Sequence, residues 1–486
     1  MEKNIQKIIP VGLLWLFSIP LFAQNNDDAK WKWNSGENDK SYLSVMKLGD
    51  DTLRSTPEFT VTDNHHWWEA FGYNTLNELA NQALNENQNI KIAKSQTGIA
   101  KERVDVAKSG FFPSISVNPS FTRQEFSANR PMQFDIAAQR VQTNTYSIPV
   151  NLSYEVDIFG KIKNSVDASR YNYEATAASQ ENMTLYITSE VSRNFIQLIT
   201  LDTETKILER TVSTRQENLE IVETRYNAGL TNEIDLQRAK TELSSVAVQL
   251  KSNQLRRTEI ELALASLCGR PASSFSIPKT GIEYLAPQIN PLQSESLATN
   301  RPDLKAAGLS IQAYEEQLKN SRKSLLPSLY LDGSAGLVSG SADHLFEENS
   351  RAWLAGATLA IPVFEGGKRR SQVSISALQK QAVVEDYKLQ EQLANEDVER
   401  ALSNLLRINE QLTAQQEFLN AAQMAAELSN QRYLKGLVTY LEVVDAERIV
   451  LEAERMSVQL LGEQLLSTVN LIVASGGDKG IVEFNR

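Results

Sequence analysis

Few residues of this chain stand in an arrangement that supports covalent chemistry. The 486 residues include one cysteine, Cys268, and three histidines, which excludes a disulfide framework and a cysteine-built zinc site. The sequence contains no glycine-rich phosphate loop, nucleophile elbow or metal-ligand spacing. Its 60 acidic residues form pairs by chance, and none stands in a loop motif with a recognisable partner. We therefore expect a protein that is not an enzyme and has neither a cofactor nor a metal site.

One pair of carboxylates could act on ions through its negative charge. Glu442 and Asp445 are three residues apart, which puts both on one face of a helix. Such a pair is commonly an exposed acidic face, but around a symmetry axis it would repeat as a ring that favours cations. The net charge of −11 argues against a nucleic-acid partner, because such proteins usually carry a basic face.

The prolines and glycines indicate very long helices. The tracts 150–270 and 363–486 contain no proline, which costs about 3 kcal/mol inside a helix. Glycines divide them into the segments 161–228, 230–268 and 368–435. At about 1.5 Å per residue, the first and third segments would each span roughly 100 Å as one helix. The alternative is a series of shorter helices with unmarked breaks.

The chain is a tandem duplication. Residues 225–230 (RYNAGL) return 207 positions later as 432–437 (RYLKGL), and 111–114 (FFPS) resemble 325–328 (LLPS). Each copy therefore has roughly 200 residues, which is too long for a short-period solenoid.

Each long segment is followed by a second helical segment with a coiled-coil seam. Apolar residues there recur at steps of three and four, as in two packed helices. Glycine adopts the left-handed conformation without strain, so Gly229 and Gly436 suit the turns that join the antiparallel helices. The seam residues are Leu236, Ala239, Leu243, Val246 and Leu250 in the first copy, and Val443, Ala446, Val450 and Ala453 in the second.

The proline-containing stretches indicate one β-hairpin in each copy. Residues 146–158 alternate strictly between apolar and polar, which is the period of a half-buried strand. We expect hairpins at about 112–158 and 326–364, with polar loops at about 124–143 and 339–351. Their remaining apolar faces are Ile115, Val117 and Phe121; Leu329, Leu331, Ala335 and Leu337; and Trp353, Ala355, Ala357, Leu359, Ile361 and Val363.

These strands suit an outer-membrane barrel, which about 9–11 tilted residues per strand cross. The alternative is that the hairpins pack on their own helices. A basic start followed by the apolar run 8–22 indicates a signal peptide cleaved after Ala23. Open sheet edges are not tolerated in lipid, and four strands cannot close a barrel. Three chains would supply twelve, so we expect a homotrimer.

Several motifs together resemble one protein family. They are Trp67-Trp68 with Phe71, LSYEVDIFGK at 152–161, LCGRP at 267–271 and RPDL at 301–304. From about residue 67 to 475 the chain is similar to the TolC/OprM-type outer membrane efflux proteins, in their NodT-like subgroup. The resemblance implies a mainly α fold with a small β part. Long antiparallel coiled-coil helices would form an α-barrel tunnel, and two β-hairpins per chain would contribute to a trimeric 12-stranded outer-membrane β-barrel.

The resemblance also implies a division of the chain. It comprises a signal peptide (1–23), an N-terminal extended segment (24–66), a first repeat (67–270), an equatorial linker (271–300), a second repeat (301–475) and a C-terminal tail (476–486).

The implied function is the exit duct of a tripartite efflux or secretion system in the outer membrane, with its helical tunnel in the periplasm. The implied partners are two further chains, a periplasmic adaptor (membrane fusion protein), an inner-membrane RND- or ABC-type transporter, and outer membrane lipid. The alternatives are a periplasmic coiled-coil scaffold or adaptor and, with less support, a secreted hydrolase.

Three groups of site residues follow from the resemblance. Glu442 and Asp445 match the acidic constriction of the periplasmic aperture. Some members have a basic residue soon after the second tip glycine, where this chain has Val438, so Arg225 and Arg432 become candidates for the closing contact. The implied helix links of the closed state are Asp235, Tyr433, Arg225 and Arg432, and the implied adaptor-docking tips are Gly229, Leu230, Thr231, Gly436, Leu437 and Val438.

Overall fold

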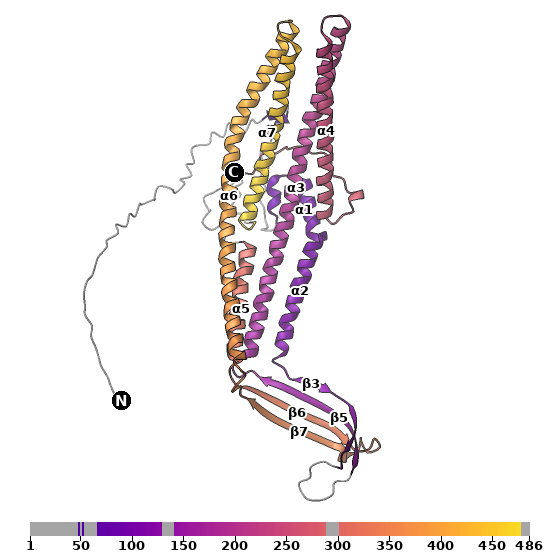
Figure 1. The fold of residues 1–486 in the computed structure, drawn as a ribbon, viewed down its shortest axis with the longest axis vertical. Helices are drawn as coiled ribbons and strands as arrows, with labels where there is room; N and C mark the ends of the chain where they lie inside the picture. The colour runs from indigo at the N-terminus through magenta and orange to yellow at the C-terminus, as the bar shows by residue number, and fades with distance from the viewer. Residues whose placement is uncertain (1–46, 49–50, 53–65, 129–139, 288–300, 478–486) are drawn as a thin grey trace, which may run out of the picture. The chain divides into compact units, whose positions relative to one another are not determined.

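The computed structural model describes residues 47–48, 51–52, 66–128, 140–287 and 301–477 (Figure 1). The chain divides into 1–45 and 46–486, and every described residue belongs to the second unit. The expected signal peptide, most of the segment 24–66, and parts of the linker and the C-terminal tail lie outside the described residues. Two short strands, β1 (Lys47–Leu48) and β2 (Asp51–Thr52), pair with each other.

Four long helices confirm the prediction of uninterrupted helical segments. Helices α3 (Lys161–Asn227) and α6 (Lys368–Leu434) have 67 residues each. Each is followed by a helix of 35 residues, α4 (Glu233–Leu267) and α7 (Tyr440–Ala474). The equal lengths in the two halves of the chain agree with the duplication, and the alternative of several shorter helices is wrong.

Three shorter helices complete the helical part. Helices α1 (Asn74–Glu86) and α2 (Gln88–Ser109) pack against α3, and α5 (Pro302–Lys323) packs against both α3 and α6. Within the ranges that the structure describes, no helix is both long enough and apolar enough to cross a membrane. The described residues also form 3₁₀ helices at Trp67–Phe71, Ala272–Ser274 and Glu348–Ser350.

The two hairpins form one antiparallel sheet. Its strands are β3 (Ser114–Val117), β4 (Ser120–Phe126), β5 (Val141–Val156), β6 (Ser328–Ser339) and β7 (Arg351–Ala360). Both β3 and β4 pair with β5, which pairs with β6, and β6 pairs with β7. The two predicted hairpins are confirmed. Within the described chain, β7 and the β3–β4 line form the two outer edges of the sheet.

Three boundaries of the predicted hairpins are wrong. The pairing of β4 with β5 continues to Phe126 and Val141, so both strands reach into the predicted loop of about 124–143. Strand β7 ends at Ala360, so Ile361 and Val363 lie beyond it. Pro362 has no N–H group to continue the ladder.

Strand β5 ends at Val156 rather than at 158, and the residue that follows it directly is Asp157, which caps the next helix. Its carboxylate accepts hydrogen bonds from the backbone N–H groups of Ile162 (3.0 Å) and Lys163 (2.9 Å), at the start of α3. Side-chain acceptors of this kind satisfy the free N–H groups of a helix N-terminus. The change from strand to helix is therefore fixed by one side chain.

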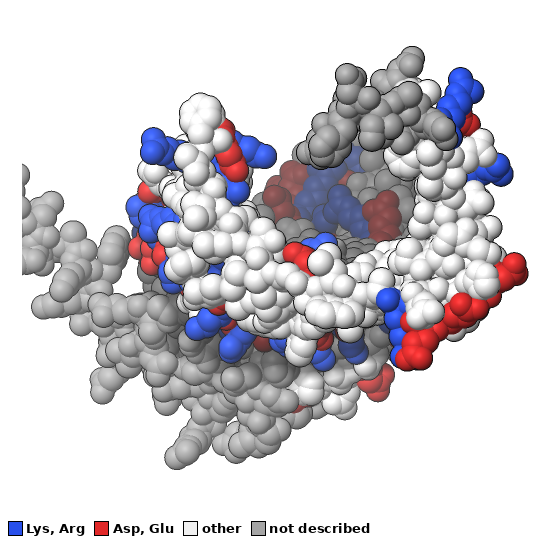
Figure 2. All heavy atoms as spheres, turned by 90° about the horizontal axis from the view of Figure 1, so that it is seen from below, with Lys and Arg blue, Asp and Glu red and all other residues white. Residues whose placement is uncertain are grey.

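The predicted apolar faces lie together on one face of the sheet. Ile115 pairs with Leu152, and Phe121 pairs with Tyr146 at 4.7 Å between ring centroids. These side chains are uncovered in a single chain: Ile115 is 66% exposed and Trp353 is 81% exposed. Seen from the sheet end, the surface is mostly uncharged, with charged side chains gathered at its margins and inside a hollow (Figure 2).

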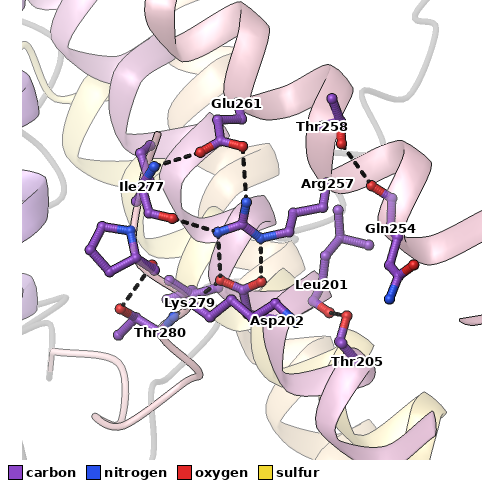
Figure 3. Close-up of polar contacts among 12 residues, drawn as sticks. Leu201, Asp202, Thr205, Gln254, Arg257, Thr258, Glu261, Ile277, Lys279 and Thr280 are labelled. Carbon is purple, nitrogen blue, oxygen red and sulfur yellow. Dashed lines mark hydrogen bonds and ion pairs between the residues drawn. The ribbon is translucent and has the colours of Figure 1, made fainter. Parts of the chain in front are cut away.

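The segment that follows α4 is held to α3 and α4 by the half-buried guanidinium group of Arg257 (Figure 3). Arg257 donates to Asp202 (2.6 Å), to Glu261 (3.0 Å) and to the backbone carbonyl of Ile277 (2.8 Å). Asp202 also accepts from the N–H group of Thr280 (3.1 Å). Because Asp202 is buried, these contacts satisfy a charge that would otherwise be costly. They fix the position of the start of the predicted equatorial linker.

Candidate gate at the helical tips

Both pairs of long helices end in the same turn. The two tip glycines have left-handed backbones, with φ of 73° at Gly229 and 72° at Gly436. In each turn, two backbone N–H groups close back onto the last turn of the helix, which is the Schellman arrangement. The bonds run from Leu230 to Arg225 (2.8 Å), Gly229 to Tyr226 (2.9 Å), Leu437 to Arg432 (2.9 Å) and Gly436 to Tyr433 (2.9 Å).

The turns present apolar side chains outward. Leu230 is 71% exposed and Leu437 is 66% exposed, while Thr231 and Val438 are half-buried. Thr231 donates a hydrogen bond to the Asp235 carboxylate (2.8 Å) and so ties its turn to the start of α4. The six predicted docking residues therefore lie at the two tips, and their contact with an adaptor stays a prediction.

The predicted links join the two halves of the chain through Tyr433. The guanidinium of Arg225 lies over the Tyr433 ring at 4.9 Å from its centroid, a cation–π contact between α3 and α6. Burial raises the pKa of Tyr433, and the charge of Asp235 adds to this rise while Arg225 opposes it. The Tyr433 ring also packs against Tyr440, at 5.5 Å between centroids.

Among the described residues, neither Asp235 nor Arg432 forms a side-chain hydrogen bond or ion pair with the opposite half. Asp235 takes its hydrogen bond from Thr231 and its ion pair from Arg238 (3.7 Å), both in its own hairpin of helices. The side chain of Arg432 has neither a hydrogen bond nor an ion pair within the part of the chain that the structure describes. Of the four predicted links, the structure brings together Arg225 and Tyr433.

Glu442 and Asp445 lie on the uncovered side of α7. Both are exposed, whereas Val443 and Val444 between them are buried against the first half of the chain. Asp445 lies 3.8 Å from Arg448, one turn further along the helix. The two carboxylates therefore share a face that points away from the packed core.

A set of charged and polar side chains that the sequence did not predict connects the two halves of the chain. We call it the inter-repeat clamp, and its members are Arg215, Asn218, Glu242, Glu447 and Arg448. Glu447 pairs with Arg215 on α3 and accepts from Asn218 (3.2 Å), while Arg448 donates to Glu242 on α4 (3.1 Å). Two neighbouring residues of α7 thus reach two different helices of the first half.

Each ion pair of the clamp has one buried partner, whereas Glu447 is half-buried and Arg448 is exposed. The side chains of Arg215 and Glu242 are 2% and 6% exposed. Burial lowers the pKa of Arg215, and the Glu242 carboxylate opposes that shift. Breaking a buried pair by removing one partner is strongly destabilising. The available sequence signal was Glu242 itself, a charge beside the apolar seam positions Ala239 and Leu243.

Two cavities flank the bridge between Glu242 and Arg448, and both residues line both of them. Their volumes are ≈ 470 Å³ and ≈ 420 Å³. The described residues include no group of three or more His, Cys, Asp and Glu side chains placed to hold a metal ion. Cys268 is buried at the end of α4, and burial raises the pKa of its thiol to about 11. The groups described at the tips interact through ion pairs, hydrogen bonds and ring contacts.

The chain is similar to known outer membrane proteins along most of its length. The chain is 24% identical over 424 residues to the probable outer membrane lipoprotein SilC of Salmonella typhimurium, covering 87% of this chain and 90% of that protein. It is 26% identical to the pyoverdine export outer membrane protein OpmQ of Pseudomonas aeruginosa, covering 86% and 88%. It is 24% identical to the cation efflux system protein CusC of Escherichia coli K12, covering 85% and 89%.

Solved structures show the same fold. A crystal structure of CusC matches with a TM-score of 0.78 at 24% identity, covering 88% of this chain and 99% of that one. The outer membrane protein VceC of Vibrio cholerae matches with a TM-score of 0.78 at 22% identity, covering 85% and 98%.

A family model covers both halves of the chain. The model of the outer membrane efflux protein matches residues 79–270 and 294–477, so each half carries one copy of the matched pattern. The chain therefore belongs to the outer membrane efflux protein family.

Proposed function

We propose that this chain is the outer-membrane exit duct of a tripartite efflux or secretion system. The observation that carries this proposal is the family match over both repeats, together with a sheet whose apolar face is uncovered. An uncovered apolar face on antiparallel strands suits contact with lipid acyl chains. The long helices would then extend into the periplasm.

The duct is proposed to be a homotrimer. The edges formed by the β3–β4 line and by β7 have no partner strand within the described chain. In lipid, each unpaired backbone group costs several kcal/mol, so these edges must pair with other chains. Three chains that each contribute both edges would close a twelve-stranded barrel.

We assign cargo selection to the pump rather than to the duct. OpmQ is named for pyoverdine export and CusC for cation efflux, yet this chain is similarly related to both. Because two relatives of similar sequence identity are named for different cargoes, we infer that the duct is a passive conduit without a cargo-specific site. The proposed partners are a periplasmic adaptor, which would meet the tips at Gly229 and Gly436, and an inner-membrane RND- or ABC-type transporter.

The gate is proposed to lie near the tips. Rings of Glu442 and Asp445 from three chains would narrow the aperture and favour cations. Arg225, Tyr433 and Asp235 would help to hold the closed arrangement, and Arg432 is free to take part. An adaptor that binds the open arrangement more tightly would shift the population toward it.

Fractionation tests the location. A duct stays with outer membranes after high-salt washing and runs as an SDS-resistant trimer that dissociates on boiling. A periplasmic scaffold or adaptor would be released by the wash, and this result would overturn the proposed function.

Planar-bilayer recording tests the gate separately. We expect Asp235→Ala combined with Tyr433→Phe to raise the single-channel conductance, because the variant removes the Asp235 carboxylate, whose charge acts on Tyr433, and the Tyr433 hydroxyl. Tyr226→Phe is the matched control, since Tyr226 holds the equivalent place in the first half. Unchanged conductance in the double variant would reject the link assignment while leaving the duct function standing.

A further inference from the structure

Four helix ends meet at one level beside the sheet, where α2 and α5 end and α3 and α6 begin. Asn320 of α5 donates to the carbonyl of Lys161 (2.8 Å), and Lys323 donates to the carbonyl of Gly160 (3.1 Å). Arg369 of α6 donates to the carbonyl of Ser324, just after α5. The first residues of α3 and α6 and the last residues of α5 are therefore close neighbours.

The helices that begin here carry charges that oppose helix stability. Lys161 and Lys163 stand in the first turn of α3, residues 368–370 of α6 are Lys-Arg-Arg, and neither first turn contains an acid. Cations are unfavourable at a helix N-terminus, where the macrodipole is positive. Helices α4 and α7, which begin at the tips, have acids in their first turns as expected. Helix stability therefore does not explain why five cations stand in the first turns of α3 and α6.

Part of this charge is not neutralised by the chain. Lys161 pairs with Glu155 (2.9 Å), and Arg369 pairs with Glu365 (2.8 Å). The three remaining cations, together with Arg322 in the last turn of α5, form what we call the basic collar. All are exposed, and none has a carboxylate within 4.0 Å among the described residues. The collar consists of Lys163, Arg322, Lys368 and Arg370.

A group of exposed apolar residues, which we call the apolar belt, stands in the sequence between the strands and these helix ends. Its members are strongly exposed: Phe112 71%, Ile158 56%, Ile361 59%, Val363 91% and Phe364 88%. Exposed apolar groups of this size next to cations are typical of a surface that meets both hydrocarbon and anionic headgroups. Figure 2 shows Lys and Arg side chains at the margin of the mostly uncharged surface.

We propose that the basic collar binds the phosphate groups of anionic phospholipids in the periplasmic leaflet of the membrane. This inference rests on the proposed function, which places the belt in the hydrocarbon and the collar at the depth of the headgroups. Charge complementarity favours this occupant, because the collar is basic in a chain whose net charge is −11. Lipid phosphates would then neutralise the collar cations that have no carboxylate partner among the described residues.

The test uses full-length trimers reconstituted in vesicles of equal amounts of phosphatidylcholine and phosphatidylglycerol. Native mass spectrometry counts the lipids of each kind that remain bound. The variant K163Q/K368Q/R370Q removes three cations whose loss does not weaken the helices. The control K251Q/R256Q/K435Q removes three exposed cations from α4 and the second tip.

We expect the wild type and the control to retain phosphatidylglycerol in preference to phosphatidylcholine. In the collar variant the preference should fall at least about fivefold, since each cation near an anionic surface contributes an effect of that order. A preference that survives in the collar variant, falls equally in the control or is absent from the wild type would overturn the inference. Wild-type protein that fails to insert into the vesicles would instead overturn the proposed function.

Discussion

The two helical tips have the same backbone and different charges. Both close through a left-handed glycine with the same pair of hydrogen bonds. Lys240 of α4 corresponds to Glu447 of α7, and Thr241 corresponds to Arg448. Lys240 makes only an exposed ion pair with Glu223 (3.6 Å), whereas Glu447 reaches the buried Arg215. The duplication thus preserved the turn, whereas the ion pairs of the clamp come from Glu447 and Arg448, which have no charged equivalent of the same sign at Lys240 and Thr241.

The largest expected effect is a difference in stability between variants at the equivalent positions Glu447 and Lys240. Glu447→Ala should lower the free energy of unfolding by about 3 kcal/mol, because it leaves the buried Arg215 without its ion-pair partner. Lys240→Ala should cost less than about 1 kcal/mol, because its ion pair is exposed. Urea unfolding followed by circular dichroism measures both. Similar losses would show that the clamp is no stronger than a surface ion pair.

The glycines should behave alike in the two halves. Gly229→Ala and Gly436→Ala should each cost about 1–2 kcal/mol, because a side chain disfavours the left-handed backbone. An added Cβ would meet nothing within 4 Å at either position, so backbone conformation alone sets the cost. Thermal unfolding of the two variants compares them directly. A clear inequality would contradict the structural equivalence of the two turns.

We expect acid to weaken the cap at the start of α5 but not the cap at the start of α2. Asp303 near the start of α5 is partly buried, which opposes ionisation, but hydrogen bonds from Arg301 and the backbone outweigh burial and lower its pKa. Its stabilising effect is therefore present above its ordinary pKa and is lost as the pH falls through the lowered value. Asp303→Asn should cost about 1 kcal/mol at neutral pH and nothing in strong acid.

The corresponding start of α2 provides the control. Asn87 accepts from the N–H groups of Asn89 (2.8 Å) and Ile90 (3.3 Å), and its amide does not titrate. Asn87→Ala should cost about 1 kcal/mol at every pH. Denaturant midpoints of both variants at neutral and acidic pH check the pair. A pH-independent loss for Asp303→Asn would refute its role as an ionised partner.

The smallest effect is expected where α4 and α7 end. Cys268 is equivalent to Ser475, and both are buried. Ser475 satisfies its hydroxyl by donating to the carbonyl of Ile472 (2.7 Å). Cys268→Ser should therefore cost less than about 1 kcal/mol, because an equivalent bond is available to it. A loss above about 2 kcal/mol in thermal unfolding would show that the two sites are packed differently.

The sequence was most informative where a local rule decides the structure. The absence of proline predicted α3 and α6 almost to the residue, and strict alternation predicted the apolar face that contains Ile115 and Leu152. Strand ends were less predictable because single residues set them, as Pro362 does for β7. The clamp was missed because Arg215 and Glu447 are 232 positions apart, and helical periodicity does not reveal which distant charges meet.

The two unpaired edges of the sheet have a genetic consequence. In the proposed trimer every chain offers one edge to each neighbour, so a single defective chain interrupts a head-to-tail ring. A variant with a proline placed in β7 would still occupy a position next to its normal partners. In cells that express both forms, the share of intact ducts should fall as the third power of the wild-type fraction. Mutations at these edges are therefore expected to be dominant, while mutations in the helical core would be recessive.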